Sequence, residues 1–347
     1  MASKLSSSPT AWRLARDLGL RPVPDALTAV LAYCERRVRS FLKEFTETPT
    51  IEALLEFAAN KVGTSFEVIR NDGDLDRVIQ TYTGRGERGF AALCHELSDA
   101  VLGVTFKLTK AQDFELQYVS VIDCRGSKAP RMYFTMWHEI GHLLLLTDQT
   151  RLQFYRTHGH GDDSDPEERI VDIVAARFGF YAPLLQEHVA GEASFEEIDR
   201  VRRDACPAAS QQAALIGIAA AWTTPLILMR AEPALRKADV RAANQSAFDF
   251  APRPRPALRA VKMTTSESAR LTKLTIHQNM RVPERSVIHS VFTAGLGYDE
   301  ADEDLSWWEA SDGSRLPPRP VRVKARWSGG AVDALVIDRR DTAKKAS

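Results

Sequence analysis

The amino-acid sequence predicts an α+β protein made of several domains. Its 347 residues are 44% hydrophobic and 27% charged, which suggests two or three domains with sizeable cores. Apolar residues recur at helical spacing through much of the first two-thirds of the chain, whereas short β-type runs prevail in the last third. A proline-rich stretch, 248–257, separates the two parts, because alternating prolines favour an extended backbone and cannot continue a helix.

These patterns divide the chain into six segments. We expect an N-terminal helical extension, a domain of helices with a small mixed sheet, and a helix-turn-helix-like unit of three helices. The linker, a β-rich domain and a disordered tail follow. In chain order the segments are 1–46, 47–190, 191–247, 248–257, 258–340 and 341–347.

The elements before residue 123 are predicted from periodicity. Residues 11–46 carry apolar side chains at alternating steps of four and three, and a further helix opens at Thr50. A strand is expected at 64–69 and another helix at 90–101. The run 116–122 alternates in polarity, so we expect it to be an edge strand of a mixed sheet, to which a substrate backbone can add.

The sequence His-Glu-Ile-Gly-His at 138–142 has the spacing of a metal-binding helix. Residues four apart lie on one face of a helix, so His138 and His142 can bind one ion. Glu139 lies beside them, where it can accept a proton from the ion's water. This is the HExxH arrangement of zinc hydrolases, in which Zn²⁺ lowers the pKa of its bound water to about 7. The alternative is two core histidines satisfied by hydrogen bonds.

A third protein ligand is expected on a second helix. Asp165 and Pro166 are typical of a helix start, and apolar residues continue the helix toward Gly179. Glu168 and Asp172 share one face of this helix. Glu168 can therefore ligate the ion, while Asp172 accepts a hydrogen bond from the remote N–H of a ligand histidine. The extended metzincin pattern is excluded, because its glycine and third histidine are missing.

Other residues compete for these roles. Glu168 also stands at the N3 position of a capping box, and Glu167 is an alternative ligand. His158 and His160 could also reach a metal, but a loop is a poor frame for a ligand, so they are expected to line the cleft or face solvent. The candidates for stabilising an oxyanion are Tyr155, His158 and Tyr181.

The four cysteines show no CxxC spacing, which fits a reducing compartment better than a disulfide framework. Cys124 follows directly after the strand expected at 116–122. One hypothesis is that its thiolate occupies the open zinc position as an inhibitory ligand in a resting state. The other is an ordinary half-buried thiol.

Two segments together resemble the ImmA/IrrE family of bacterial metallopeptidases. They are Arg-Met-Tyr-Phe-Thr-Met-Trp-His-Glu-Ile-Gly-His at 131–142 and Glu-Arg-Ile-Val-Asp-Ile-Val-Ala-Ala at 168–176. The family pattern is R-x-x-F-T-x-A-H-E-x-x-H followed by E-x-x-x-N/D-x-F-A-A, from which Trp137 and Val174 depart. The resemblance implies a zinc endopeptidase with a zincin-like catalytic domain that cuts a helix-turn-helix repressor. The implied ligands are His138, His142 and Glu168, with Glu139 as the base.

The resemblance also implies a biological setting. The segment 258–340 is similar to the degenerate GAF-like sensor domain of the family's longer members. Expected partners are a repressor encoded nearby and, at the sensor domain, ssDNA or a small-molecule activator. Activity is then expected in a stress, DNA-damage or anti-phage response. The alternatives are a DNA-associated regulator or antitoxin-like binding protein with a structural zinc, and a peptidase that cuts a toxin.

The elements after residue 190 are predicted as three helices and then strands. The helices begin at Ser194, Ser210 and Pro225, and the last two are almost free of Lys and Arg, which favours packing on the protease core over contact with DNA. The paired Trp307 and Trp308 are core anchors or a stacking surface for a ligand. The strands are expected at 258–264, 287–292, 321–327 and 331–337, with a Ser-Gly-Gly turn before the last.

Charge and hydropathy limit the classes of partner. The 46 basic residues balance 46 acidic residues, so any contact with DNA must come from a local patch. The sequence has no apolar run of about 18 residues and no apolar core of a signal peptide, so no membrane partner is expected. Cytoplasmic placement is the corresponding expectation.

Overall fold

The computed structural model describes residues 8–21, 25–109, 116–146, 153–157, 165–236, 255–310 and 313–340, with the single positions 5 and 239. The described chain is a mixture of helices and strands, as predicted, and forms two compact units. Unit 1 comprises Met1–Leu184 and Arg202–Ala213, and unit 2 comprises Leu185–Val201 and Ala214–Ser347. Most of the predicted linker (248–254) and the tail (341–347) lie outside the described residues.

Unit 1 contains a four-stranded sheet of order β1-β3-β2-β4. β1 (Thr64–Ile69) is parallel to β3 (Tyr118–Asp123), which is antiparallel to β2 (Val101–Lys107). β2 is in turn antiparallel to β4 (Gln153–Thr157). The prediction that the strand at 116–122 is an edge strand was wrong, because β3 lies between β1 and β2 and all its residues are buried. Its alternation reflects a buried, hydrogen-bonded serine rather than a solvated face.

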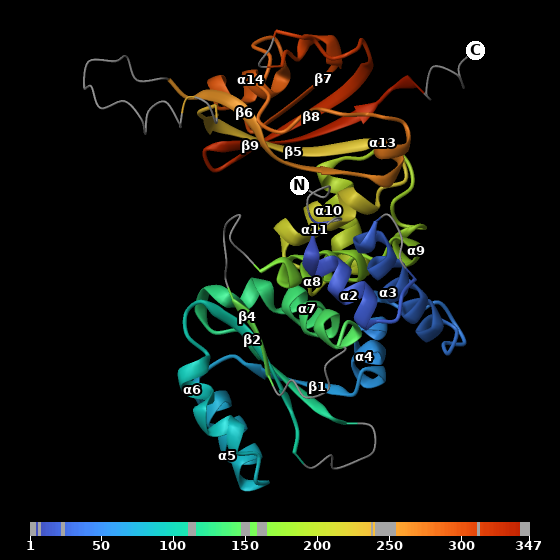
Figure 1. Cartoon of the computed structure of the whole chain (residues 1–347). Helices are drawn as coiled ribbons and strands as arrows, with labels where there is room; N and C mark the ends of the chain where they lie inside the picture. The colour runs from blue at the N-terminus through green and yellow to red at the C-terminus, as the bar shows by residue number, and fades with distance from the viewer. Residues whose placement is uncertain are drawn as a thin grey trace. The chain divides into compact units, whose positions relative to one another are not determined.

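Helices cover the two faces of this sheet. α5 (Asp72–Gly84), η1 (Arg88–Ala92) and α6 (Leu93–Glu96) share one apolar core with β2 and β3. α7 (Met132–Leu144) lies against β2, β3 and β4 (Figure 1). The helix predicted at 90–101 is reduced to η1 and α6, because β2 already begins at Val101.

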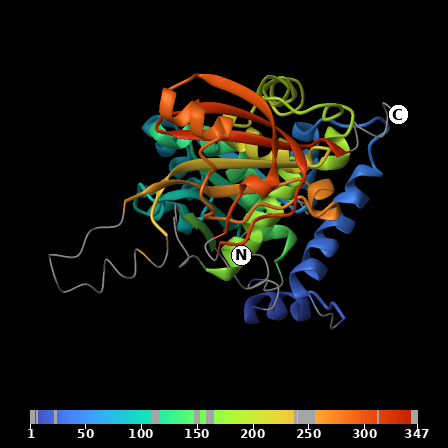
Figure 2. The ribbon, with the colours of Figure 1, turned by 90° about the horizontal axis from the view of Figure 1, so that it is seen from above.

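Two N-terminal helices contact α8 (Pro166–Gly179). They are α2 (Pro9–Asp17) and α3 (Ala26–Leu42), which is the long blue helix of Figure 2. A third helix, α4 (Ile51–Lys61), contacts α3, α7 and β1. The Thr50 hydroxyl caps α4 by accepting from Ala53 N at 3.1 Å, so the predicted helix start is confirmed. Buried Glu35 of α3 accepts from Arg177 Nε at 3.0 Å and from the Tyr181 hydroxyl at 2.7 Å. The contacts of α2 and α3 therefore stabilise the position of α8.

A buried ion-pair cluster fixes the chain where β3 leads into α7. Asp123 accepts from Lys128 Nζ at 2.6 Å and from Arg125 Nε at 2.9 Å. Lys128 Nζ also donates to the carbonyls of Ser98 and Val101 at 2.8 and 2.9 Å, which ties η2 (Gly126–Arg131) to the start of β2. Burial alone would raise the pKa of Asp123, but the hydrogen bonds from Arg125 and Lys128 outweigh it and hold that pKa below its usual value.

Unit 2 contains an antiparallel five-stranded sheet of order β6-β5-β9-β8-β7. Its strands are β5 (Leu226–Ala234), β6 (Ala257–Thr265), β7 (Tyr298–Asp304), β8 (Pro320–Ser328) and β9 (Ala331–Asp338). β8 and β9 form the predicted hairpin, in which Gly329 and Gly330 have φ of +54° and +89°, as the two central residues of such a turn require. The strands predicted at 258–264, 321–327 and 331–337 are confirmed.

Two predicted elements of unit 2 have a different structure, and strand β7 was not predicted. The third helix expected from Pro225 is instead strand β5, so the three-helix unit is not formed, and only α10 (Phe195–Ala205) and α11 (Gln211–Ala221) are present. A short apolar run fits a buried strand as well as a helix, and here pairing with β6 and β9 on both sides decides. The strand expected at 287–292 is helix α14 (Val287–Ala294), which Ser286 caps by accepting from Ile288 N at 3.2 Å.

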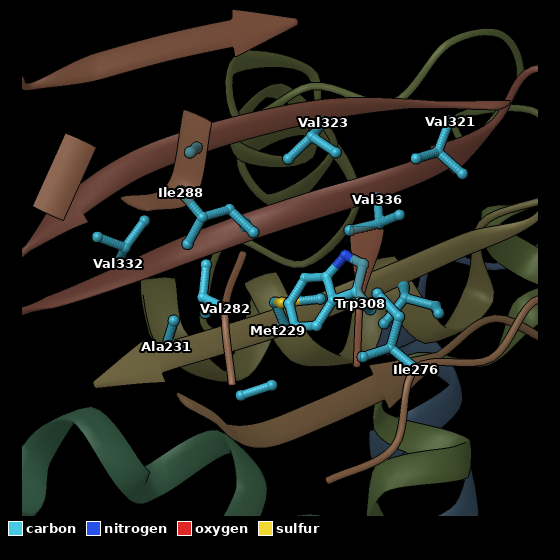
Figure 3. Packing of buried hydrophobic residues seen from close by; sticks show 14 of the residues in the cluster. Met229, Ala231, Ile276, Val282, Ile288, Trp308, Val321, Val323, Val332 and Val336 are labelled. Carbon is cyan, nitrogen blue, oxygen red and sulfur yellow. The ribbon is translucent and has the colours of Figure 1, made fainter. Parts of the chain in front are cut away.

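The core of unit 2 lies between the sheet and the segments that follow β6. These include α13 (Glu267–Leu271), α14 and η3 (Leu305–Trp307). Trp308 is 1% exposed and lies in this core with Met229, Ile276 and Val336 (Figure 3). Trp307 is only partly buried and carries the Arg285 guanidinium 4.1 Å from its ring centroid. One member of the tryptophan pair is thus a core anchor.

The remaining short helix is α9 (Ala182–Leu185). Among the described residues, no helix has the length and apolar character needed to cross a bilayer.

We predict that Asp123→Asn lowers the free energy of unfolding by about 2–4 kcal/mol at pH 7, because it leaves the buried Lys128 and the partly buried Arg125 without their counter-charge. The folded-state pKa is depressed, so the wild-type advantage is present above the unfolded pKa of about 3.9 and is lost as pH falls through the folded value. Urea denaturation of wild type and Asp123→Asn at pH 7 and pH 3 measures the difference in their free energies of unfolding at the two pH values.

The matched control is Asp72→Asn, since Asp72 also pairs with Arg125 but its side chain is 87% exposed. It should change stability by no more than about 1 kcal/mol at either pH. A difference between wild type and Asp123→Asn that stays constant with pH would contradict the prediction.

Candidate metal centre

Helix α7 places three ionisable side chains inside the protein. His138, Glu139 and His142 are 1%, 0% and 3% exposed, and apolar residues such as Ile140 and Leu143 fill the rest of the helix. Buried polar groups need partners to offset their desolvation. The partners of the histidines come from α8.

The start of α8 is as predicted, with Asp165 Oδ1 accepting from Glu167 N at 2.9 Å and Pro166 in the first turn. The side chain of Glu168 does not fold back on this cap. Its Oε2 lies 3.1 Å from His138 Nε2, and its Oε1 lies 3.2 Å from His142 Nε2. The capping-box alternative is therefore not the arrangement found.

Small residues let α7 and α8 approach each other. A Cβ added at Gly141 would lie 3.0 Å from Val171 Cγ1, and one at Gly179 would lie 3.1 Å from Trp137 Cδ1. The backbone of each helix is thus packed directly on side chains of the other. This close approach brings Glu168 within reach of both imidazoles.

The nitrogen and oxygen atoms of His138, His142 and Glu168 fit a single divalent ion. The two Nε2 atoms are 3.1 Å apart, and one potential ligand atom from each residue lies within 4.8 Å of the others. Neighbouring ligands of a tetrahedral ion with bonds of about 2.0–2.1 Å are separated by about 3.3 Å. The observed separations of 3.1 to 3.2 Å are close to this value.

Asp172 lies behind the group on α8, where its Oδ1 is 2.8 Å from His138 Nδ1. A carboxylate at this position accepts a hydrogen bond from Nδ1–H. This favours the tautomer in which Nε2 carries a lone pair and no proton. That lone pair faces Glu168 Oε2, so two acceptors meet at 3.1 Å unless a proton or a cation lies between them. The ligand set therefore suits a metal ion.

Charge in the group agrees with this geometry. Burial opposes ionisation of Glu168, but its hydrogen-bond contacts with His138 and His142 outweigh burial and hold its pKa well below the usual range. An ionised carboxylate is a hard ligand, and imidazole nitrogens are borderline ligands. Zinc is typically bound by a combination of the two.

The Glu139 side chain contacts the sheet. Its Oε2 accepts from the Thr105 hydroxyl at 2.7 Å, while its buried Oε1 has no hydrogen-bond partner among the described residues. Thr105 was not among the site residues predicted from the sequence. The signal that could have found it is a polar residue in the middle of the apolar run of β2.

The other residues named from the sequence are placed elsewhere. Glu167 pairs with Arg13 at 2.9 Å and does not belong to the group of three. Cys124 is also outside that group, and burial, with the nearby charge of Asp123, raises the pKa of its thiol to about 11, which favours the neutral form. The Tyr181 hydroxyl donates to Glu35.

The structure does not describe the side chains of the remaining candidates. His158 and His160 lie outside the described residues, and Tyr155 is described only as part of the backbone of β4. A protein group that stabilises an oxyanion is therefore not identified among the described residues.

Comparison with known proteins assigns no family: neither the protein-family models nor the curated proteins contain a match to this chain. The resemblance of the two motifs to ImmA/IrrE peptidases thus remains a prediction from the sequence.

We predict that the chain binds one Zn²⁺ and that His142→Ala abolishes this binding. Asp172→Asn should weaken binding by about 10–100-fold, because an amide orients the ligand imidazole less well than a carboxylate. Competition with a chromophoric chelator measures the affinities, with elemental analysis for stoichiometry. His95→Ala is the control, since His95 is exposed and outside the group. Equal affinity of His142→Ala and wild type would refute the assignment.

Proposed function

We propose that this protein is a zinc-dependent endopeptidase, with His138, His142 and Glu168 as metal ligands and Glu139 as general base. The observation that carries the proposal is the combination of a three-residue ligand group with a separate buried carboxylate next to it in the sequence. A structural zinc site is usually closed by four protein ligands, whereas a catalytic site has three and keeps one position open. Among the described residues the group has three.

Zinc held by this group would polarise a scissile carbonyl and lower the pKa of a water molecule. The protein's own residues would perform the proton transfers. Glu139 Oε1 accepts a proton from the attacking water molecule while the oxygen of that water molecule bonds to the carbonyl carbon. The same carboxyl then donates that proton to the amide nitrogen as the C–N bond breaks, so the carboxylate is regenerated. Asp172 keeps the His138 imidazole in one tautomer and orientation.

The substrate that we propose is a helix-turn-helix repressor encoded nearby, cut in a stress, DNA-damage or anti-phage response in the cytoplasm. This part is supported by the motifs at 131–142 and 168–176. We also propose a zincin-like fold for the peptidase part and a GAF-like sensor for 258–340. The proposed activator of this sensor is ssDNA or a small molecule. The five-stranded sheet and its helices are compatible with such a sensor.

We predict that Glu139→Gln retains zinc but cleaves at least about 100-fold more slowly, because the amide cannot accept the proton. The substrate to use is the small helix-turn-helix protein encoded beside this gene, incubated with the zinc-loaded full chain, with and without ssDNA. New N-termini are identified by mass spectrometry. A chelator should stop cleavage, and added zinc should restore it.

The second substrate is a peptide library made from a bacterial proteome. It detects cleavage if the target is a toxin or another protein and not the neighbouring repressor. The endopeptidase proposal would be overturned if wild type and Glu139→Gln behaved alike on both substrates, whether both cut or neither did. That result would favour a DNA-associated regulator or antitoxin-like protein with a structural zinc.

A further inference from the structure

A chain of three buried hydroxyls crosses the sheet of unit 1 and ends on Glu139. Thr64 Oγ1 lies 3.0 Å from Ser120 Oγ, which lies 2.6 Å from Thr105 Oγ1, and this last hydroxyl donates to Glu139 Oε2 at 2.7 Å. The three hydroxyl residues are at most 1% exposed. They come from β1, β3 and β2, three neighbouring strands of one sheet.

The register of the strands brings these hydroxyl groups next to one another. Thr105 is directly opposite Ser120 in the antiparallel pair of β2 and β3. Gly103, two residues before Thr105, projects to the same face of β2. A Cβ at Gly103 would lie 2.9 Å from both Glu139 Oε1 and Thr135 Cγ2 of α7, so the absence of a side chain makes room for these two side chains. Strand β2 thus both admits Glu139 and binds it.

Proton counting fixes the direction of the chain. Each hydroxyl has one proton to donate. The Thr105 proton is donated to the carboxylate, so Ser120 must donate to Thr105. Thr64 Oγ1 has two acceptors within reach, Ser120 Oγ at 3.0 Å and the Ser65 carbonyl at 3.3 Å. The O–H groups of Thr105 and Ser120 therefore point toward Glu139 when it is a carboxylate. The contacts also polarise one another in a buried environment.

A structural role alone does not explain this arrangement. Three buried hydroxyls inside an apolar sheet each require a hydrogen bond to offset their desolvation, and valine in place of the two threonines and alanine in place of Ser120 would fill about the same volume without that requirement. The chain ends on a carboxylate that is 0% exposed, which is the most expensive group in this part of the molecule to bury. The polar residues of the sheet are thus matched to the charge of Glu139.

We propose that Thr105, supported by Ser120 and Thr64, is the positioning residue for the general base. Thr105 holds Oε2 of Glu139, and this leaves Oε1 as the oxygen available to an attacking water. This inference rests on the proposed function and adds the residues that orient its base. Thr105 acts through Glu139 and does not itself contact the substrate.

The test compares Thr105→Val with Thr105→Ser in the zinc-loaded full chain. With the neighbouring helix-turn-helix protein as substrate, Thr105→Val should lower kcat by about 10–100-fold, a part of the general-base contribution, with KM and zinc stoichiometry unchanged. Thr105→Ser keeps the hydroxyl and should restore kcat to within about threefold of wild type.

The control is Thr83→Val on α5, because the Thr83 hydroxyl donates only within its own helix, to the carbonyls of Ile79 and Gln80. It should leave kcat unchanged. A kcat of Thr105→Val equal to wild type, or a Thr105→Ser variant as slow as Thr105→Val, would overturn the positioning role.

A second measurement does not depend on catalysis. Thr105→Val should lower the denaturant midpoint of unfolding of the otherwise wild-type protein, because it removes the hydroxyl bound to a buried carboxylate. In a Glu139→Ala background it should lower the midpoint by less, because only the contact between Thr105 and Ser120 is then lost. Additive midpoint shifts would overturn the proposal. If no substrate is cut by wild type but the shifts are non-additive, the proposed function fails while the coupling between Thr105 and Glu139 stands.

Discussion

The close packing of α7 on α8 is the constraint on which the candidate site depends. Gly141 and Gly179 remove the side chains that would keep the two helices apart. Because of this approach, one carboxylate of α8 reaches both imidazoles of α7, and a second carboxylate reaches the far side of one imidazole. The N-terminal helices and the cluster around Asp123 hold the ends of the two helices from outside.

The site also shows how one buried helix keeps two kinds of polar group apart. The histidines of α7 turn toward α8 and its acids, whereas Glu139 turns toward the hydroxyls of the sheet. A metal ligand set and a general base need different surroundings, since ligands must converge on one point and a base must keep one oxygen free. Adjacent positions on a helix point about 100° apart, so neighbouring residues can serve both needs.

Local sequence patterns predicted the site better than they predicted the sheet that supports it. The helix caps at Thr50 and Asp165 and the spacing of His138 and His142 depend on residues a few positions apart, so they can be recognised in the sequence. The hydroxyl chain depends on the register of strands that are distant in the sequence. For the same reason β3 was expected at an edge, β5 as a helix and α14 as a strand: short apolar runs acquire their structure from their neighbours.

X-ray absorption spectroscopy of the zinc-loaded protein tests the central claim most directly. The structure predicts two imidazole nitrogens and carboxylate or water oxygens at about 2.0–2.2 Å, with no sulfur. In Glu168→Ala the protein-derived oxygen should be lost while both imidazoles remain. A sulfur at about 2.3 Å would instead identify a cysteine as a ligand, and a spectrum without two imidazoles would contradict the account altogether.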